Sequence, residues 1–267
     1  MTVTAKSLLC GMMERGDVPL GIFISSLDPS VTDIMAAERF DYVVLDGEHG
    51  RFSRVEIENH VRAAKAGGTL PFVRILENSP ALIQSTLDVG AQGLFVPHID
   101  TAEQASSAVA AARYAPSGQR GMCPACMAGG YTLDGWIDHV HASNENVMVI
   151  PILESRAAID NIEEILAVDG IDVVHFGPGD LSADLGIDFV RDFDQMSKLW
   201  ERAVQATHAA GKFILAPAGF DYDTADMLVV EMELMVLRKA VSRIVRDHRG
   251  NSAERLIMRI EGSKELS

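Results

Sequence analysis

Eight short apolar runs alternate with helical patterns along this chain, and this alternation limits its fold more than any other feature. Most runs are continuously apolar, which is typical of parallel strands buried on both faces of a sheet. We expect strands over Gly21–Ile24, Tyr42–Leu45, Leu70–Val73, Gly93–Val96, Val147–Leu153, Asp172–Phe176, Phe213–Leu215 and Glu233–Leu237. We expect helices over Val31–Glu38, Val55–Ala66, Pro80–Leu87, Ala102–Arg113, Ala157–Ala167, Phe193–Ala210, Thr224–Val230 and Val241–Arg246.

Eight strand–helix pairs predict an α/β fold of the (β/α)₈ or TIM-barrel type. A doubly wound open sheet is the alternative, because the same alternation of strands and helices produces it. The length of 267 residues suits one barrel, so we expect a single domain over residues 1–267.

Composition argues against several classes of protein. The chain has 23 Lys and Arg against 38 Asp and Glu, for a formal net charge of −15. Nucleic-acid or anionic-membrane partners need clusters of basic residues, so neither is expected. No apolar run approaches the ~20 residues of a membrane span, and the N-terminus lacks a signal-peptide pattern. Three cysteines are too few for a disulfide scaffold, which favours a cytoplasmic protein.

Two segments interrupt the alternation. Residues 114–134 form a Gly- and Pro-rich stretch, and loops of that length are usually functional or interfacial. Residues 252–261 are expected to form an extra amphipathic helix with Leu256, Ile257 and Ile260 on one face. A barrel does not need this helix, so we expect it at an interface between subunits.

The ends of the strand runs supply the candidate site residues, because the active site of a barrel lies at the carboxyl ends of its strands. Acidic, basic and imidazole side chains follow these runs. In chain order they are Asp46, Glu48, His49, Arg74, His98, Glu154 and Asp180.

Glu154 and Asp180 follow neighbouring strands, which suits the oxygen ligands of a divalent cation such as Mg²⁺ or Mn²⁺. The alternative is that each carboxylate caps the helix that follows it. The Gly177–Asp180 turn also offers backbone N–H groups to an anion at the start of a helix, although Gly-Pro-Gly is a common turn.

His49 and Arg74 have the chemistry of a proton-transfer and charge-stabilising pair. A histidine oriented by a carboxylate such as Asp46 suits general acid–base catalysis; the alternative is a structural histidine at a strand end. Arg74 places a permanent charge in the barrel mouth, where it suits an enolate or a carboxylate. A salt bridge from Arg74 to Glu48 or Glu154 is compatible with that role.

Two other features are expected to carry no chemistry. Cys123 and Cys126 form a lone CxxC motif without the two further ligands that a zinc site needs. His175 lies inside an expected strand, where a packed histidine is more common than a ligand.

Six segments together point to a known family: LDGEHG (45–50), PFVRI (71–75), LDVGAQGLFVP (87–97), RYAPSGQRG (113–121), ILES (152–155) and FGPGDLSADLG (176–186). In this order they resemble the HpcH/HpaI aldolase family, and the resemblance runs from about Gly21 to Gly186. Members of that family are class II, metal-dependent pyruvate aldolases, including 4-hydroxy-2-oxoheptanedioate and 2-keto-3-deoxy sugar-acid aldolases.

The resemblance implies a metal site and an assembly. Glu154 and Asp180 match the protein ligands of a divalent metal, for which Mg²⁺, Mn²⁺ and Co²⁺ are the candidates. The family fold is a barrel whose last helix swaps onto a neighbouring subunit. The resemblance therefore implies a homo-oligomer, and specifically a hexamer built as a trimer of dimers.

The resemblance also implies roles toward the substrate. Arg74 matches the arginine that steadies the pyruvate enolate, and His49 with Asp46 matches the acid–base pair. Gly179 and Asp180 match the residues whose backbone amides hold the pyruvate carboxylate.

Several positions depart from the family pattern. Ile152 stands where the family usually carries Gln, and Pro151 beside it is unusual in a central strand. His98 replaces the usual Met after the fourth strand, and the expected eighth strand ends in Arg238 and Lys239. Because these positions lie apart from those matched to pyruvate, we expect His98 with Arg238 or Lys239 to contact the acceptor aldehyde.

We therefore expect an aldehyde-lyase that reversibly cleaves a 4-hydroxy-2-oxo acid to pyruvate, or a pyruvate-like 2-oxo acid, and an aldehyde. One alternative is a lyase of the citrate-lyase β type that acts on an acyl-CoA thioester, which needs a basic patch for the CoA phosphates. The other is a catalytically silent homologue that binds an oxo acid, which Ile152 and Pro151 motivate.

Overall fold

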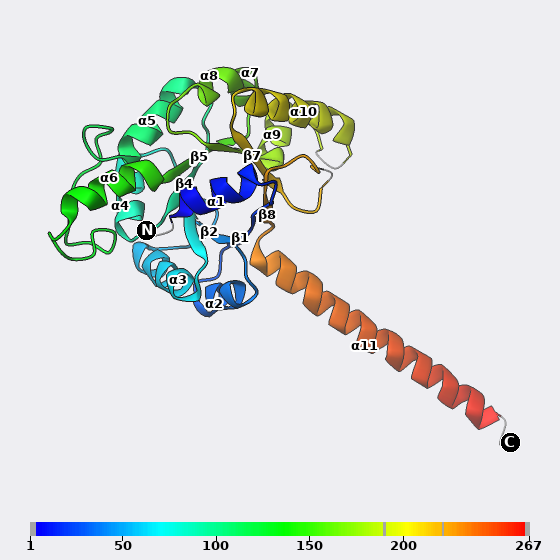
Figure 1. The fold of residues 1–267 in the computed structure, drawn as a ribbon. Helices are drawn as coiled ribbons and strands as arrows, with labels where there is room; N and C mark the ends of the chain where they lie inside the picture. The colour runs from blue at the N-terminus through cyan, green and yellow to red at the C-terminus, as the bar shows by residue number, and fades with distance from the viewer. Residues whose placement is uncertain (1–3, 189–190, 221, 265–267) are drawn as a thin grey trace.

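Eight parallel strands form the centre of the computed structural model, which describes residues 4–188, 191–220 and 222–264, with the backbone alone from residue 250 onward. The strands are β1 (Leu20–Ile24), β2 (Tyr42–Asp46), β3 (Leu70–Arg74), β4 (Gly93–Val96), β5 (Met148–Leu153), β6 (Val173–Phe176), β7 (Phe213–Pro217) and β8 (Met227–Val230). They follow one another in chain order, and β8 pairs with β1 to close the barrel (Figure 1). The closed barrel confirms the predicted fold over the open sheet.

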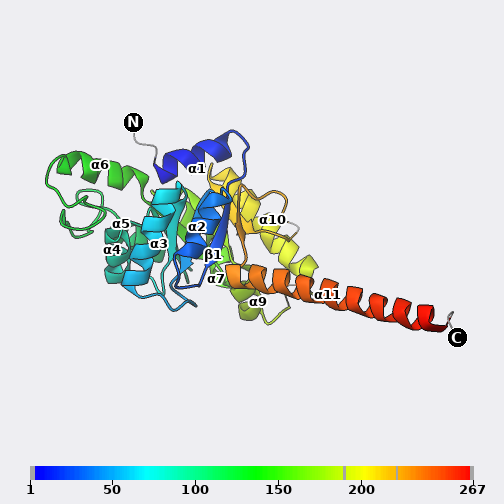
Figure 2. The same cartoon turned by 90° about the horizontal axis from the view of Figure 1, so that it is seen from below.

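Most of the helices surround the barrel on its outer side (Figures 1 and 2). The helices are α1 (Ala5–Glu14), α2 (Ser30–Ala37), α3 (Arg54–Gly67), α4 (Pro80–Asp88), α5 (Ala102–Ala112), α6 (Trp136–Asn146), α7 (Arg156–Asp160), α8 (Ile162–Leu166), α9 (Pro178–Leu185), α10 (Phe193–Ala209) and α11 (Glu233–Lys264). Among the described helices, none combines the length and the apolar character needed to cross a membrane.

The buried apolar side chains form two cores, one inside the barrel and one between the barrel and its helices. Successive strand residues point to opposite faces, so on β6 Val173 belongs to the inner core and Val174 to the outer core, and both are fully buried. Phe72 and Phe95 pack edge to face in the interior, with ring centroids 6.2 Å apart. Burial on both faces explains why the strand runs are continuously apolar.

Helix α1, which we did not predict, closes the amino-terminal end of the barrel. Its Ala5, Leu9 and Met13 are buried and belong to the inner core. Thr4 and Ser7 cap its first turn reciprocally. Figure 2 shows α1 across one end of the barrel, with α9 toward the opposite end. The spacing of four residues between the three buried side chains is the helical signal that could have identified it.

Two predictions at the end of the barrel were wrong. Residues Met227–Val230 form β8, where the sequence predicts a helix over Thr224–Val230, and the expected strand Glu233–Leu237 begins α11 instead. Both stretches contain four consecutive apolar residues. Periodicity cannot distinguish a short buried strand from a helical turn in such runs.

Two carboxylates fix the true boundaries through contacts with distant segments. Asp226 Oδ2 accepts the backbone N–H of Ile214 at 2.8 Å, which aligns the start of β8 with β7. Glu233 is buried and accepts the backbone N–H of Ser25 at 2.9 Å and of Ser26 at 2.6 Å. The start of α11 is thereby tied to the loop after β1.

Helix α11 leaves the barrel as one continuous helix (Figure 1). It contains both the expected helix over Val241–Arg246 and the expected extra helix over 252–261, so the chain does not break at Gly250. The apolar face predicted for residues 252–261 involves side chains outside the described residues. Before residue 250, the exposed apolar side chains of α11 are Leu234, Met235, Val236, Leu237, Val241, Ile244 and Val245.

The long stretch over residues 114–134 contains turns and one isolated bridge, between Tyr114 and Arg120. Arg120 is buried and forms a salt bridge with Asp88 of α4 at 2.8 Å. Its guanidinium also lies over the Tyr114 ring, with Cζ 4.5 Å from the ring centroid. This ion pair anchors the stretch against the helical layer.

Candidate active site

A cavity of about 360 Å³ opens at the carboxyl ends of the strands, and its volume falls within the range of small-molecule sites. Five of the predicted site residues line it, namely His49, Arg74, Glu154, Gly179 and Asp180. Two more predicted residues hydrogen-bond to members of this lining, namely Asp46 and His98. The structure therefore brings these seven predicted residues together at one end of the barrel.

Arg74 is held in a defined orientation at the end of β3. Asp46 lies beside it in register at the end of β2, and Arg74 Nε donates to Asp46 Oδ1 at 2.8 Å. Arg74 Nη1 lies 3.1 Å from Glu48 Oε2, and the guanidinium Cζ lies 4.8 Å from the centroid of the Phe23 ring. These contacts orient the Arg74 side chain, which is 12% exposed and lines the cavity. Arg74 therefore presents an oriented positive charge to the cavity.

Asp46 shapes the turn that carries His49. Its Oδ1 accepts the backbone N–H of Glu48 at 3.2 Å and of His49 at 3.3 Å. A Cβ at Gly50 would lie 1.9 Å from the Asp46 carbonyl oxygen, so this close approach requires glycine. The His49 imidazole is exposed, and its Nε2 lies 3.8 Å from Glu48 Oε2. Asp46 thus contacts His49 through the backbone, and the acid–base pair of these residues stays a prediction.

Glu154 is a buried carboxylate at the end of β5, with 4% of the residue exposed. Its Oε1 accepts the backbone N–H of His98 at 2.7 Å and lies 3.0 Å from His98 Nδ1. Burial raises the pKa of the Glu154 carboxyl, the contacts with His98 lower it, and the nearby Glu48 and Asp180 carboxylates raise it further. A positive charge beside Glu154 would favour its ionised form.

A group of residues around Glu154 has the spacing of a metal site. Ligand atoms of Glu48, His98 and Glu154 lie within 4.8 Å of one another. His98 has a φ of +55°, which is uncommon for a residue other than glycine. Of the two ligands that the sequence predicts, Glu154 belongs to this group of described residues and Asp180 does not, and the geometry adds Glu48 and His98 as candidates. Glu48 was available as a signal, since it lies in the same strand-end segment as His49.

Gly177 allows the chain to pass close to Glu154 before α9 begins. A Cβ at Gly177 would lie 3.0 Å from both Glu154 Cβ and Ile152 Cγ2, which is tighter than ordinary contact. Gly179 and Asp180 lie in the first turn of α9, where backbone N–H groups have no partner within the helix. This strand end therefore has the backbone arrangement that binds carboxylates.

The outer wall of the cavity differs from the prediction. Arg238 and Lys239 lie in α11 and not at the end of a strand, and neither is among the described residues that line the cavity. Lys239 Nζ instead pairs with Glu231. Their placement at a strand end was wrong because the eighth strand ends at Val230. Glu231 and four apolar side chains form this wall, the apolar ones being Phe220, Val230, Met232 and Met235.

His175 lies on β6 and lines the same cavity. The sequence predicts a packed histidine, and its ring lies near Phe23 and Phe95, with centroids 6.3 and 5.5 Å away. Burial, with a further effect of Arg74, lowers the pKa of His175 to about 3. The imidazole is therefore neutral at physiological pH.

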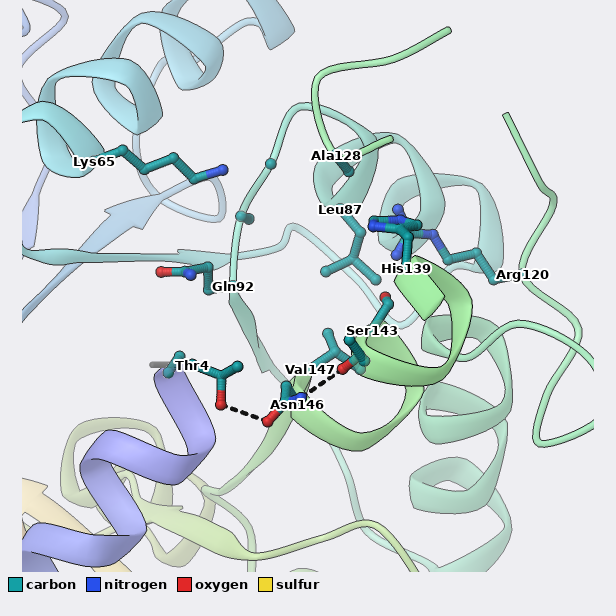
Figure 3. Close-up of a pocket in the computed structure, with 14 residues that line it drawn as sticks. Thr4, Lys65, Leu87, Gln92, Arg120, Ala128, His139, Ser143, Asn146 and Val147 are labelled. Carbon is teal, nitrogen blue, oxygen red and sulfur yellow. Dashed lines mark hydrogen bonds between the residues drawn. The ribbon is translucent and has the colours of Figure 1, made fainter. Parts of the chain in front are cut away.

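A second cavity lies at the opposite end of the barrel (Figure 3). Gln92 precedes β4 and Val147 precedes β5, which places this cavity at the amino-terminal ends of the strands. Thr4 and Asn146 form a hydrogen bond at its edge. None of the predicted site residues lines it, so we assign the candidate active site to the first cavity.

Cys123 and Cys126 lie in the long stretch over residues 114–134, and both thiols are free. Cys126 Sγ donates to the carbonyl oxygen of Cys123 at 3.0 Å. In the part of the chain that the structure describes, neither cysteine joins a cluster of metal-ligating side chains.

Comparisons with known proteins identify the relatives of this chain. The pattern of the HpcH/HpaI aldolase/citrate lyase family matches residues 20–238. The 2-keto-3-deoxy-L-rhamnonate aldolase of Salmonella gallinarum is 36% identical over 201 residues, which cover 75% of this chain and 74% of that protein. The crystal structure of an HpcH/HpaI aldolase from Desulfitobacterium hafniense matches with a TM-score of 0.84 at 28% identity, over 90% of this chain and 96% of that chain.

A more distant likeness concerns the fold alone. The citrate lyase β subunit of M. tuberculosis, solved with oxaloacetate and magnesium, matches with a TM-score of 0.53 at 18% identity. The match covers 82% of this chain and 93% of that chain.

Proposed function

Because this chain belongs to the HpcH/HpaI aldolase/citrate lyase family, we propose that it reversibly cleaves a 4-hydroxy-2-oxo acid to pyruvate, or a pyruvate-like 2-oxo acid, and an aldehyde. The main support for this proposal is that one cavity is lined by Arg74, Glu154 and the Gly179–Asp180 turn. The rhamnonate aldolase relative makes 2-keto-3-deoxy sugar acids the first substrates to test.

The residues around Glu154 fit a divalent cation. The Glu48 and Asp180 carboxylates both act on the buried Glu154 carboxyl and raise its pKa, so the site has an excess of negative charge. Oxygen donors of this kind suit Mg²⁺ and Mn²⁺, and a nitrogen donor such as His98 also suits Co²⁺. Glu154 and Asp180 are the proposed ligands, with Glu48 and His98 as further candidates. Such an ion, when bound, polarises the oxo group of the substrate.

Arg74 and the start of α9 hold the 2-oxo acid in this proposal. Cleavage of the C3–C4 bond leaves an electron pair on C3, which delocalises onto the oxo oxygen as an enolate. Asp46 and Glu48 orient Arg74 beforehand, so its charge stabilises the enolate without reorganisation during the reaction. The backbone N–H groups of Gly179 and Asp180 bind the carboxylate.

His49 is the proposed acid–base group. In the cleavage direction, a base removes the proton of the 4-hydroxyl group as the aldehyde forms, and an acid then protonates C3 of the enolate. His49 lines the cavity, and histidine is the side chain best suited to exchange protons near neutral pH. Glu48 Oε2 lies 3.8 Å from its Nε2, which is longer than a hydrogen bond.

The acyl-CoA alternative finds less support in the cavity. The CoA phosphates require basic side chains, whereas the outer wall consists of four apolar side chains and the acidic Glu231. The silent homologue draws support from Ile152, which is 1% exposed and lines the cavity beside Glu154. Retention of Arg74, His49 and Glu154 in the same cavity favours the active enzyme over both.

We also propose that the chain forms a homo-oligomer, a hexamer built as a trimer of dimers, in which α11 packs on a neighbouring subunit. The exposed apolar side chains of α11 before residue 250 support this arrangement, because large exposed apolar patches mark interfaces. Met235 of α11 also lines the cavity, so a covering subunit would lie beside the site.

Pyruvate release from a panel of substrates tests the proposed reaction. Protein stripped with EDTA is assayed with 2-keto-3-deoxy sugar acids, 4-hydroxy-2-oxoheptanedioate and an acyl-CoA thioester, before and after addition of Mg²⁺, Mn²⁺ or Co²⁺. We expect pyruvate from one or both oxo-acid classes once metal is restored. Cleavage of the thioester alone would identify an acyl-CoA lyase, and binding of pyruvate without any cleavage would identify a silent homologue.

A further inference from the structure

The second cavity, at the amino-terminal ends of the strands, is lined by basic residues (Figure 3). It has a volume of about 210 Å³, and its charged or titratable lining residues are Lys65, Arg120 and His139. Among the described residues, no Asp or Glu lines it. The chain as a whole carries a formal net charge of −15, so the lining differs in sign from the chain. This electrostatic character suits an anion.

Lys65 supplies the positive charge that nothing in the protein neutralises. Arg120 is paired with Asp88. Burial, with a further effect of Arg120, lowers the pKa of His139, so the imidazole is neutral at physiological pH. Lys65 has neither an ion pair nor a hydrogen bond within the described part of the chain, and the protein atoms around its ammonium group, with a further effect of Arg62, lower its pKa.

The Lys65 ammonium group lies against the turn that precedes β4. Gly90 in this turn has a φ of +91°, which favours glycine, and a Cβ there would lie 2.7 Å from Lys65 Nζ. Lys65 also lies in the last turn of α3, where a positive charge interacts favourably with the helix dipole. The dipole accounts for a lysine at this helix end, and the open turn beside it gives its ammonium group room at the cavity.

Two neutral polar side chains of the cavity are available to a ligand. Gln92 and Ser143 are half-buried. Within the described residues, neither the Gln92 amide nor the Ser143 hydroxyl group has a hydrogen-bond partner, and neither is among the fully buried unpaired atoms. Their polar atoms therefore reach the surface of the cavity. Figure 3 shows Lys65 and Gln92 on one side of the cavity and Ser143 of α6 on the other. In contrast, Arg120 Nε and His139 Nε2 are fully buried and cannot contact a ligand.

The lining also defines the class of anion. One unneutralised cation balances one negative charge, which suits a monocarboxylate better than a phosphate or a dicarboxylate. Leu87, Ala128 and Val147 are among the lining residues, and apolar side chains of this kind contact the carbon skeleton of a ligand. The ligand expected here is therefore a small molecule with one carboxylate and an apolar body.

We propose that this cavity binds a small, apolar monocarboxylate, which pairs with the Lys65 ammonium group and accepts a hydrogen bond from the Gln92 amide. The cavity lies at the end of the barrel opposite the candidate active site, so this ligand is not the substrate of the cleavage. Gln92 leads into β4 and Val147 into β5, and the far ends of these strands lead to His98 and Glu154. The ligand thus contacts the two strands that lead to the candidate metal site.

Two small molecules with the same carbon skeleton test this proposal. 3-Methylbutanoate carries one negative charge, and 3-methylbutanamide is its neutral counterpart. Each is titrated into the full-length, metal-supplied protein, and binding is followed by NMR through the methyl groups of Leu87, Ala128 and Val147. The titrations are repeated for Lys65→Met and Lys65→Arg. Lys198→Met is the matched control, because it changes the net charge equally at an exposed position of α10.

We expect the wild type to bind the carboxylate about tenfold more tightly than the amide, which is the effect of one charge-assisted hydrogen bond. Lys65→Met should lose this preference and Lys65→Arg should retain part of it. Lys198→Met should behave as the wild type.

Three results would overturn the proposal. The first is equal affinity of the wild type for the two compounds, a comparison that needs no variant to fold. The second is an unchanged preference in Lys65→Met, or an equal loss in Lys198→Met. The third is a response to the carboxylate that is absent from all three methyl reporters, including one confined to Ile152 and Val230 of the first cavity. Pyruvate release from the substrate panel tests the proposed cleavage independently of these results.

Discussion

At the scale of single residues, Arg74 provides a positive charge in a fixed orientation. Substitution by alanine removes the charge, whereas substitution by lysine keeps the charge and changes its orientation. Lysine keeps the charge but cannot reproduce the contacts of the guanidinium with Asp46 and Glu48. We expect Arg74→Ala to lower kcat/KM by roughly 10²–10³-fold and Arg74→Lys by less, with metal affinity unchanged in both. Steady-state kinetics beside calorimetric metal titration provide the check. A parallel loss of metal affinity would show that Arg74 supports the metal site instead.

His175 makes the stability of the folded protein depend on pH. Its pKa in the folded state is about 3, below the ~6.5 of an unfolded histidine. A lowered histidine pKa contributes stability that is present above ~6.5 and is lost as pH falls toward 3, because only the unfolded chain binds the proton. When the pH falls from 7 to 5, we expect the unfolding free energy of the wild type to decrease by about 2 kcal/mol more than that of His175→Gln. Urea unfolding at both pH values measures this, and equal losses would contradict it.

The location of the site could be predicted from the sequence, but its internal contacts could not. Strand ends converge in any barrel, so the positions of His49, Arg74 and Glu154 followed from the order of the strands. The contacts depend on turn geometry instead. The left-handed backbone of His98 and its hydrogen bond to Glu154 have no signature in the local pattern. For the same reason, Glu48 was predicted as a strand-end residue and a possible partner of Arg74, which the structure shows, but not as a candidate metal ligand.

At the scale of elements, the first seven strands lie where the apolar runs predict them. The errors concern apolar runs that fit a strand or a helix equally well, and helices that lie outside the strand–helix alternation. The MLVV run of β8 and the LMVL run of α11 are equivalent by pattern, and distant contacts of Asp226 and Glu233 distinguish them. Helices α1 and α6 lie outside the regular strand–helix alternation. Pattern reasoning based on that alternation therefore passed over both.

A buried ion pair joins the long stretch over residues 114–134 to α4. Arg120 and Asp88 are both largely buried and lie 2.8 Å apart, so removing the arginine leaves a buried charge without its partner. We expect Arg120→Met to lower the unfolding free energy by about 3 kcal/mol, measured by urea unfolding. The control is the double variant Arg120→Met, Asp88→Asn, which should recover part of the loss. A change below about 0.5 kcal/mol would show that the pair is not an anchor.

At the scale of the whole molecule, α11 is the feature that a single barrel does not explain. If its apolar side chains pack on a neighbouring subunit, the full chain is an oligomer, and a chain that ends at residue 240 forms a smaller species. Light scattering after gel filtration measures both masses. In the matched control, Val241, Ile244 and Val245 are changed to Gln in the full-length chain. This variant should also form a smaller species than the wild type. A monomeric full chain, or a truncation of unchanged oligomeric state, would contradict the proposed assembly.

The central claim is that aldol cleavage depends on a cation held by Glu154. The most direct measurement is pyruvate release by EDTA-treated wild type and Glu154→Gln as Mg²⁺ or Mn²⁺ is titrated back. Gln keeps the size of the side chain and can still accept the N–H of His98. The wild type should regain activity saturably, and Glu154→Gln should remain inactive at every metal concentration. Undiminished release in EDTA, or a covalent lysine–pyruvate adduct trapped by borohydride, would contradict the account.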